Sequence, residues 1–169
     1  MSKSFDFLLS DTPEVYKTLI LNYQFVPKVF WFCNDSEQFC FINKWDDVIK
    51  GELEYDFMKF LLNKYNANCF ARGSLWVNEK EEQEIVLTFV DRDSDIGTDM
   101  IAKVSRDSEN KVNSLSEYKV YSSGKSEILF GGLFNELILD ETQLTTLETL
   151  YEEIKPRLGV RDLREVNKH

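Results

Sequence analysis

A succession of short segments with alternating apolar and polar residues, from residue 69 to residue 130, constrains the fold more than any other feature of the chain. Clusters of Gly, Asn, Asp and Ser separate these segments, which are SLWVN, EIVLTFV, MIAKVS, EYKVYSS and SEILF. A period of two is typical of strands, and such clusters are typical of turns, one of them at Gly124 and Lys125. Because the segments follow one another without helices between them, the pattern predicts an antiparallel sheet in an α+β fold.

A hairpin is predicted upstream, over residues 28–43. The run KVFWFC is almost continuously apolar, which is typical of a strand that is covered on both faces. The segment QFCFIN pairs with this strand across a four-residue turn at 34–37. We expect this hairpin to form the centre of the sheet.

The register of the hairpin determines which cysteines are neighbours. Gln38 lies opposite Cys33 and Trp31 lies opposite Cys40, so the two cysteines are diagonal, with Cβ atoms up to about 7 Å apart. A disulfide requires Cβ atoms about 3.8 Å apart. An odd number of cysteines, 3 in all, without an amino-terminal leader, indicates reduced thiols and a cytoplasmic protein.

Three helices are predicted from apolar spacing and capping residues. The first covers residues 13–23, with Thr12 as N-cap, and the second covers about 55–66. The third begins after Asp140, which forms a capping box with Gln143, and ends before Pro156. Its expected buried stripe is Leu144, Leu147, Tyr151 and Ile154.

These elements predict a single α+β domain over residues 1–169. It has a mostly antiparallel sheet of about five to seven strands and about three helices on one face, with the C-terminal helix packed on the sheet. A hydrophobic content of 43% is sufficient for one core of this size. The charged residues 160–169 are expected to form a frayed tail or a brief final turn.

Composition excludes several classes of partner. The 30 acidic and 20 basic residues give a net charge of −10, which repels the phosphate groups of nucleic acids and anionic membrane surfaces. No apolar run approaches the roughly 18 residues that a membrane helix needs. We therefore expect neither a nucleic acid nor a membrane as a partner.

The stretch DRDSDIGTD at 91–99 resembles a calcium-binding loop only in part. Asp91, Asp93 and Asp95 occupy the first acidic positions of an EF-hand. Gly97 is one place late and Ala102 stands where the bidentate glutamate is required, so the EF-hand pattern fails. A looser magnesium or calcium site is the alternative to a solvated connection between strands, which we favour. The sequence predicts no metal site.

Other catalytic patterns are incomplete. Gly124-Lys125-Ser126 lacks the upstream glycine of a phosphate-binding loop, and Ser122 with Lys125 lacks the helix on which an S-x-x-K pair works. Glu117 and Lys119 match an acid-x-lysine nuclease element that is expected by chance in a chain so rich in these residues. The only histidine is His169, so no internal imidazole is present for acid-base catalysis. The sequence predicts no catalytic residue and no cofactor.

The sequence favours a non-enzymatic, acidic, cytoplasmic binding protein of the inhibitor, immunity or adaptor type. Its partner is expected to be a basic protein, which charge would attract over a distance. The candidate partner-binding residues are Asp46, Asp47, Glu52, Glu54, Asp91, Asp93 and Asp95. The alternative is a small-molecule-binding or enzymatic domain whose pocket is lined by aromatic residues such as Phe30, Trp31 and Phe32. Core packing is the expected role of these three rings.

Overall fold

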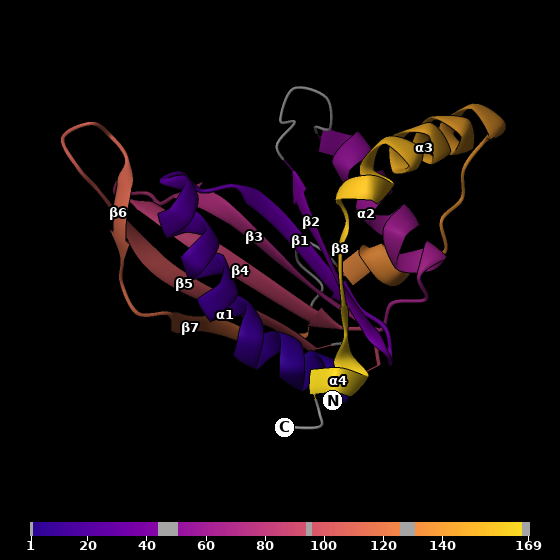
Figure 1. Ribbon diagram of the computed structural model, residues 1–169, viewed down its shortest axis with the longest axis horizontal. Coiled ribbons are helices and arrows are strands. Elements are labelled where there is room, and N and C mark those ends of the chain that lie inside the picture. Colours follow the sequence, from indigo (N-terminus) through magenta and orange to yellow (C-terminus); the bar gives the residue numbers. More distant parts are fainter. Residues whose placement is uncertain (1, 44–50, 94–95, 126–130, 167–169) are drawn as a thin grey trace.

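A computed structural model describes residues 2–43, 51–93, 96–125 and 131–166 of the chain (Figure 1). Its centre is an eight-stranded antiparallel sheet in the order β6-β5-β4-β3-β1-β2-β8, with β7 paired to β5. The strands are β1 Lys28–Cys33, β2 Glu37–Asn43, β3 Cys69–Val77, β4 Gln83–Asp91, β5 Ile96–Arg106, β6 Val112–Leu115, β7 Lys119–Lys125 and β8 Gly159–Asp162. The helices are α1 Lys3–Tyr23, α2 Gly51–Lys64, α3 Glu141–Ile154 and α4 Leu163–Val166, with short 3-10 helices η1 Gly131–Phe134 and η2 Lys155–Arg157.

The predicted α+β class, antiparallel sheet and packed C-terminal helix are confirmed, but helices cover both faces of the sheet. Helix α1 lies across one face, and α2, α3 and η1 lie on the other (Figure 1). Strand β1 explains the arrangement, because Phe30 and Phe32 pack toward α2 while Trp31 packs toward α1. The expectation of helices on one face was wrong, and the apolar run of β1 is what requires the second layer.

Helix α1 begins ten residues earlier than the predicted position at Pro13. Ser2 is its N-cap and accepts a hydrogen bond from the Phe5 amide at 3.2 Å. Pro13 lies inside the helix, and Thr12 is buried rather than capping. The buried stripe that holds the helix across this proline consists of Phe5, Leu8, Thr12, Tyr16 and Ile20. None of the helices in the described parts of the chain is long and apolar enough to cross a membrane.

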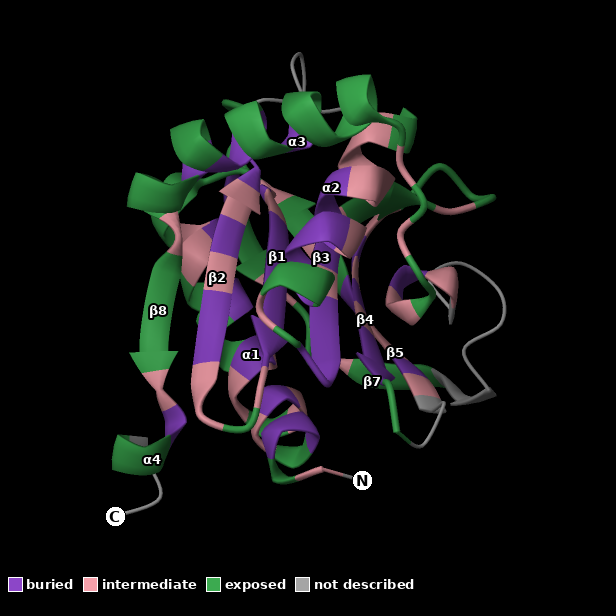
Figure 2. Cartoon of the chain, turned by 90° about the vertical axis from the view of Figure 1, so that its right-hand side faces the viewer, coloured by how far each residue is buried: buried purple, intermediate pink, exposed green. Residues whose placement is uncertain are grey.

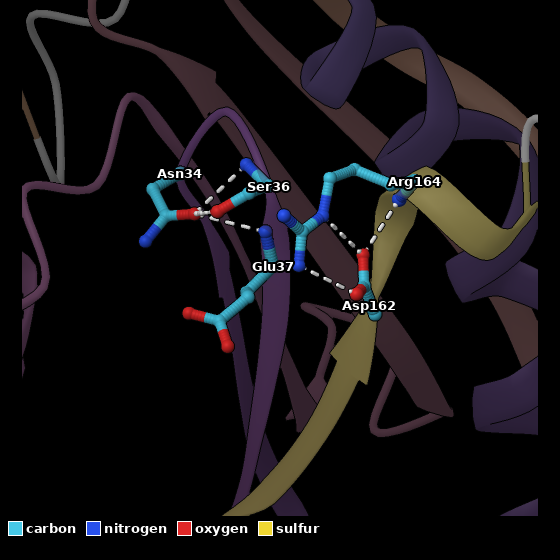
Figure 3. A network of polar contacts seen from close by, with 5 residues as sticks. All are labelled: Asn34, Ser36, Glu37, Asp162 and Arg164. Atoms are coloured by element: carbon cyan, nitrogen blue, oxygen red, sulfur yellow. Dashed lines mark hydrogen bonds and ion pairs between the residues drawn. The ribbon is translucent and has the colours of Figure 1, made fainter.

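The predicted register of the β1–β2 hairpin is confirmed, with Cys33 opposite Gln38 and Trp31 opposite Cys40. Asn34 closes the turn: its Oδ1 accepts hydrogen bonds from the amides of Ser36 at 3.0 Å and Glu37 at 2.9 Å (Figure 3). The Nδ2 atom of Asn34 donates to the carbonyl of Tyr65 at 3.1 Å, just beyond the end of α2. The Asn34 side chain therefore links the β1–β2 turn to the layer that contains α2.

Residues 160–166, in the segment predicted to be a frayed tail or a brief final turn, form most of β8 and the short helix α4. Strand β8 pairs with β2, and the Leu163 amide donates to the carbonyl of Ser36 at 2.8 Å. Leu163 is buried, and Asp162 holds the Arg164 guanidinium in two hydrogen bonds of 3.0 and 2.8 Å (Figure 3). The charged composition of residues 160–169 gave no indication that residues 159–162 pair with the edge of β2.

Helix α3 has the predicted capping box. The Gln143 amide donates to Asp140 Oδ1 at 2.8 Å, and the Asp140 amide donates to Gln143 Oε1 at 3.0 Å. Leu144, predicted to be buried, is 41% exposed, and Leu150 is buried instead. The predicted turn at Gly124 and Lys125 was also wrong, because both residues pair with β5 inside β7. The predicted strand at 126–130 lies outside the described residues.

Asn34→Ala is expected to lower the free energy of unfolding by about 1 to 2 kcal/mol, because several backbone groups lose their partner. The matched control is Asn78→Ala in the exposed β3–β4 turn. There Asn78 Oδ1 accepts from the amides of Lys80 at 2.9 Å and Glu82 at 3.0 Å, without a link to the other layer. Urea unfolding followed by circular dichroism measures both. Equal losses in the two variants would contradict the joining role of Asn34.

Candidate functional site

Asp91, one of the predicted partner-binding residues, is fully buried at the end of β4. The period of two places its side chain on the same face as Leu87 and Phe89, which α1 covers. Asp91 therefore presents no surface to a partner in the folded protein. Side chains alternate between the two faces of a strand, so a carboxylate at a buried position is buried in spite of its charge.

Glu54 is also drawn into the fold. Its side chain is 15% exposed and accepts from the Arg72 guanidinium at 3.0 Å, with Lys28 Nζ at 3.7 Å. Asp93 is 64% exposed and forms an ion pair with the adjacent Arg92 at 3.3 Å. Glu52 is exposed in the first turn of α2.

Asp46, Asp47 and Asp95 complete the predicted set and lie outside the described residues. The described members come from β4, the turn after it and the start of α2, and they range from fully buried Asp91 to exposed Glu52 and Asp93. These four do not form one exposed acidic face.

The sequence reasoning missed a second acidic region, on α3 and the segment before it. Residues 126–154 contain no Lys, Arg or His. We name as the α3 acidic surface the six exposed carboxylates Glu136, Asp140, Glu141, Glu148, Glu152 and Glu153. Figure 2 shows the outer side of α3 exposed along the helix, while its inner side, which includes Leu147 and Tyr151, is buried. The absence of basic residues over this long run was the signal that could have identified the surface.

The stability of the helix itself explains only part of this surface. Asp140 and Glu141 lie at the N-terminus of α3, where negative charge interacts favourably with the helix dipole. Glu152 and Glu153 lie in the last turn, where negative charge is unfavourable. Glu148 and Glu152 are four residues apart on one side of the helix and repel each other. The carboxylates toward the C-terminal end therefore cost α3 some stability.

Two exposed apolar side chains accompany the carboxylates. Ile138, in the segment that leads into α3, is 84% exposed, and Leu144 in the second turn of the helix is 41% exposed. The cations nearest in sequence follow the helix at Lys155 and Arg157. Lys155 Nζ lies 6.0 Å from the centre of the Tyr151 ring, at the C-terminal end of α3. The surface thus combines clustered negative charge, with Lys64 and Lys155 beside it at Tyr151, and a small apolar component.

A depression with a mostly apolar lining lies between α2 and strands β1 to β3. Arg72, Glu54 and Lys28 converge there beside the side chains of Phe30, Phe41, Phe57 and Met58. This arrangement has the aromatic lining and converging polar groups that the alternative function requires. Its enclosed volume is ≈ 10 Å³, about the space of one water molecule, whereas pockets for small organic ligands enclose roughly 300 Å³ or more.

Three comparisons with known proteins bear on the identity of the chain. No family model, no curated protein and no solved structure matches it. The α3 acidic surface and the depression beside Arg72 are therefore the two regions whose chemistry bears on function.

Proposed function

We propose that this protein is a non-enzymatic binding protein that docks a basic protein partner through the α3 acidic surface. The observation that supports the proposal is the run of exposed carboxylates on α3, several of which reduce the stability of the helix that carries them. A cationic partner would neutralise these carboxylates, which explains why the chain carries charge that is unfavourable for its own fold. The net charge of −10 adds long-range attraction for such a partner.

Ile138 and Leu144 supply the second component of the proposed interface. Charge complementarity increases the rate of association and selects partners, while desolvated apolar contacts supply much of the binding energy. Both apolar side chains are exposed on or next to the helix that carries the carboxylates. A partner with basic side chains around a small apolar patch would match this combination, as expected for an inhibitor, immunity protein or adaptor.

The test is a triple variant, Glu148→Gln, Glu152→Gln and Glu153→Gln, used as bait in a pull-down from lysate of the source cells. The control variant, Glu79→Gln, Glu81→Gln and Glu117→Gln, removes the same charge from exposed positions elsewhere. We expect the wild type and the control to retain a basic protein at 50 mM salt and to lose it at 500 mM. The triple variant should associate with that protein roughly tenfold more slowly, because steering weakens.

Several results would contradict the proposal. They are the capture of no protein, retention that does not respond to salt, or equal binding by the triple variant and the control. Circular dichroism of both variants checks that the fold is intact. Removing repulsion between Glu148 and Glu152 should leave the melting temperature unchanged or slightly higher.

The alternative function, binding of a small molecule at the depression between α2 and the sheet, has one observation in its favour. Arg72, Glu54 and Lys28 converge beside aromatic rings. Its enclosed volume of ≈ 10 Å³ is the argument against it. A fragment screen by NMR distinguishes the two proposals, because saturable shifts confined to residues around Arg72 would support the alternative.

A further inference from the structure

Cys33, Cys69 and Asp91 form a row across three adjacent strands. Cys33 lies directly opposite Cys69 in the β1–β3 pair, and Cys69 lies directly opposite Asp91 in the β3–β4 pair. All three side chains are 0% exposed, and the neighbouring Cys33 thiol raises the pKa of the Cys69 thiol. Cys40 is outside this row, since its partners are Trp31 on β1 and Gly159 on β8.

The two opposed cysteines have nearly the separation of a disulfide. Directly opposite residues of an antiparallel pair have Cα atoms about 4.5 to 5.5 Å apart, inside the range that disulfides span. Their Cβ atoms are about 4.5 to 5.5 Å apart, so closure to about 3.8 Å needs a shift of roughly 1 Å. The diagonal Cys33 and Cys40 would have to move several times farther.

We propose that Cys33 and Cys69 are a redox modification site that closes to a reversible disulfide between β1 and β3. With a disulfide such as oxidised glutathione as the oxidant, one cysteine thiolate attacks a glutathione sulfur and releases one glutathione thiolate. The second cysteine thiolate then attacks the mixed disulfide, forms the bond between Cys33 and Cys69, and releases the second glutathione. The protein loses two electrons and two protons, and oxidised glutathione becomes two molecules of reduced glutathione.

The first turn of α1 controls access to the pair. Phe5 is fully buried in the same cluster as the two cysteines, and the Ser2 side chain caps this turn by accepting from the Phe5 amide at 3.2 Å. The neighbouring Cys33 thiol, burial and the nearby Asp91 raise the pKa of the Cys69 thiol far above its usual range, so the closed state holds little reactive thiolate. Because terminal turns open at low cost, we expect reaction to follow a local opening of this turn.

The test incubates the protein in a glutathione redox buffer, with and without 8 M urea, and then blocks free thiols with N-ethylmaleimide under denaturing conditions. Digestion after glutamate separates Cys33 from Cys40 at Glu37, whereas trypsin leaves both in one peptide. Mass spectrometry should show a Cys33–Cys69 link in the native sample. In urea the short loop between Cys33 and Cys40 favours a link between these two cysteines. A different pairing in the native sample would show that the folded structure selects Cys69 as the partner of Cys33.

Two sets of variants make the result decisive. The Cys33–Cys69 link should persist in Cys40→Ser and be absent from Cys69→Ser. Ser2→Ala should increase the rate of its formation roughly fivefold, the effect of a typical N-cap loss, while Asp140→Ala, which removes the N-cap of α3, should not. Two free thiols in oxidised Cys40→Ser, or a Cys33–Cys40 link in the native wild type, would overturn the proposal. Equal rates for Ser2→Ala and Asp140→Ala would overturn the role of the α1 turn.

Discussion

Replacing Trp31 by alanine is expected to lower the free energy of unfolding by about 3 to 5 kcal/mol, the largest effect expected of any single substitution considered for this chain. Trp31 is 2% exposed at the centre of β1, and its ring meets the Tyr16 ring edge-on with centroids 5.4 Å apart. Removing the indole leaves a cavity between the sheet and α1, with rigid neighbours on both sides. Domains of this kind are stable by only about 5 to 15 kcal/mol, so the loss is a large fraction of the total.

Trp76→Ala is the matched control for this prediction. Trp76 lies in β3 and is 58% exposed, so its removal should cost less than about 1 kcal/mol. Urea unfolding followed by far-ultraviolet circular dichroism measures both variants without depending on tryptophan emission. A loss below about 1 kcal/mol for Trp31→Ala would show that this aromatic run does not hold the core. That result would favour a ligand-binding role for Phe30, Trp31 and Phe32.

The elements that the sequence predicted well are those determined by local chemistry. The β1–β2 register followed from one apolar run and one short turn, and both are local in the chain. The capping box of α3 needs only Asp140 and Gln143, three residues apart. In each case the interacting groups are close in sequence, so their spacing was sufficient to identify them.

The elements that were missed depend on contacts between distant parts of the chain. Strand β8 forms because the edge of β2 is free to pair with it, which the charged residues 160–169 do not reveal. Helix α1 extends back to Lys3 because Phe5 and Leu8 bury against the sheet, and that burial carries the helix through Pro13. Propensity and capping rules placed the start at Pro13 because they do not include this tertiary packing.

The candidate site shows the same division. The carboxylates chosen from the sequence that the structure describes lie in β4, in the turn after it and at the start of α2. Alternation along β4 buries Asp91, and Glu54 is paired with Arg72. The absence of basic residues from 126–154 could have identified the α3 acidic surface, but the exposure of Leu144 on it follows only from the observed buried stripe. That stripe uses Leu150 and leaves Leu144 exposed, a rotation of the helix that packing against α2 determines.

Gly73→Ala is expected to lower the free energy of unfolding by about 1 to 3 kcal/mol, although it adds only one methyl group. A Cβ atom at this position would lie 2.6 Å from Cε1 and 2.7 Å from Cζ of Tyr16. The Tyr16 ring has little room to move, because its hydroxyl donates to the Pro27 carbonyl at 2.8 Å and its ring packs on Trp31. The close approach of α1 to β3 therefore depends on a glycine at this position.

Gly159→Ala in β8 is the control for Gly73→Ala, because its new Cβ atom would lie 3.5 Å from Cys40 Cβ, an ordinary contact. We expect its effect to be near zero or slightly stabilising, since alanine restricts the unfolded chain more than glycine does. Combining Gly73→Ala with Tyr16→Ala should cost less than the sum of the two single changes by about 0.5 to 3 kcal/mol, because the added methyl group then occupies vacated space. Urea unfolding of the wild type, the two single variants and the double variant gives the coupling free energy between positions 16 and 73. Additive losses, or equal effects of Gly73→Ala and Gly159→Ala, would show that Tyr16 does not press on β3 and that another contact sets the position of α1.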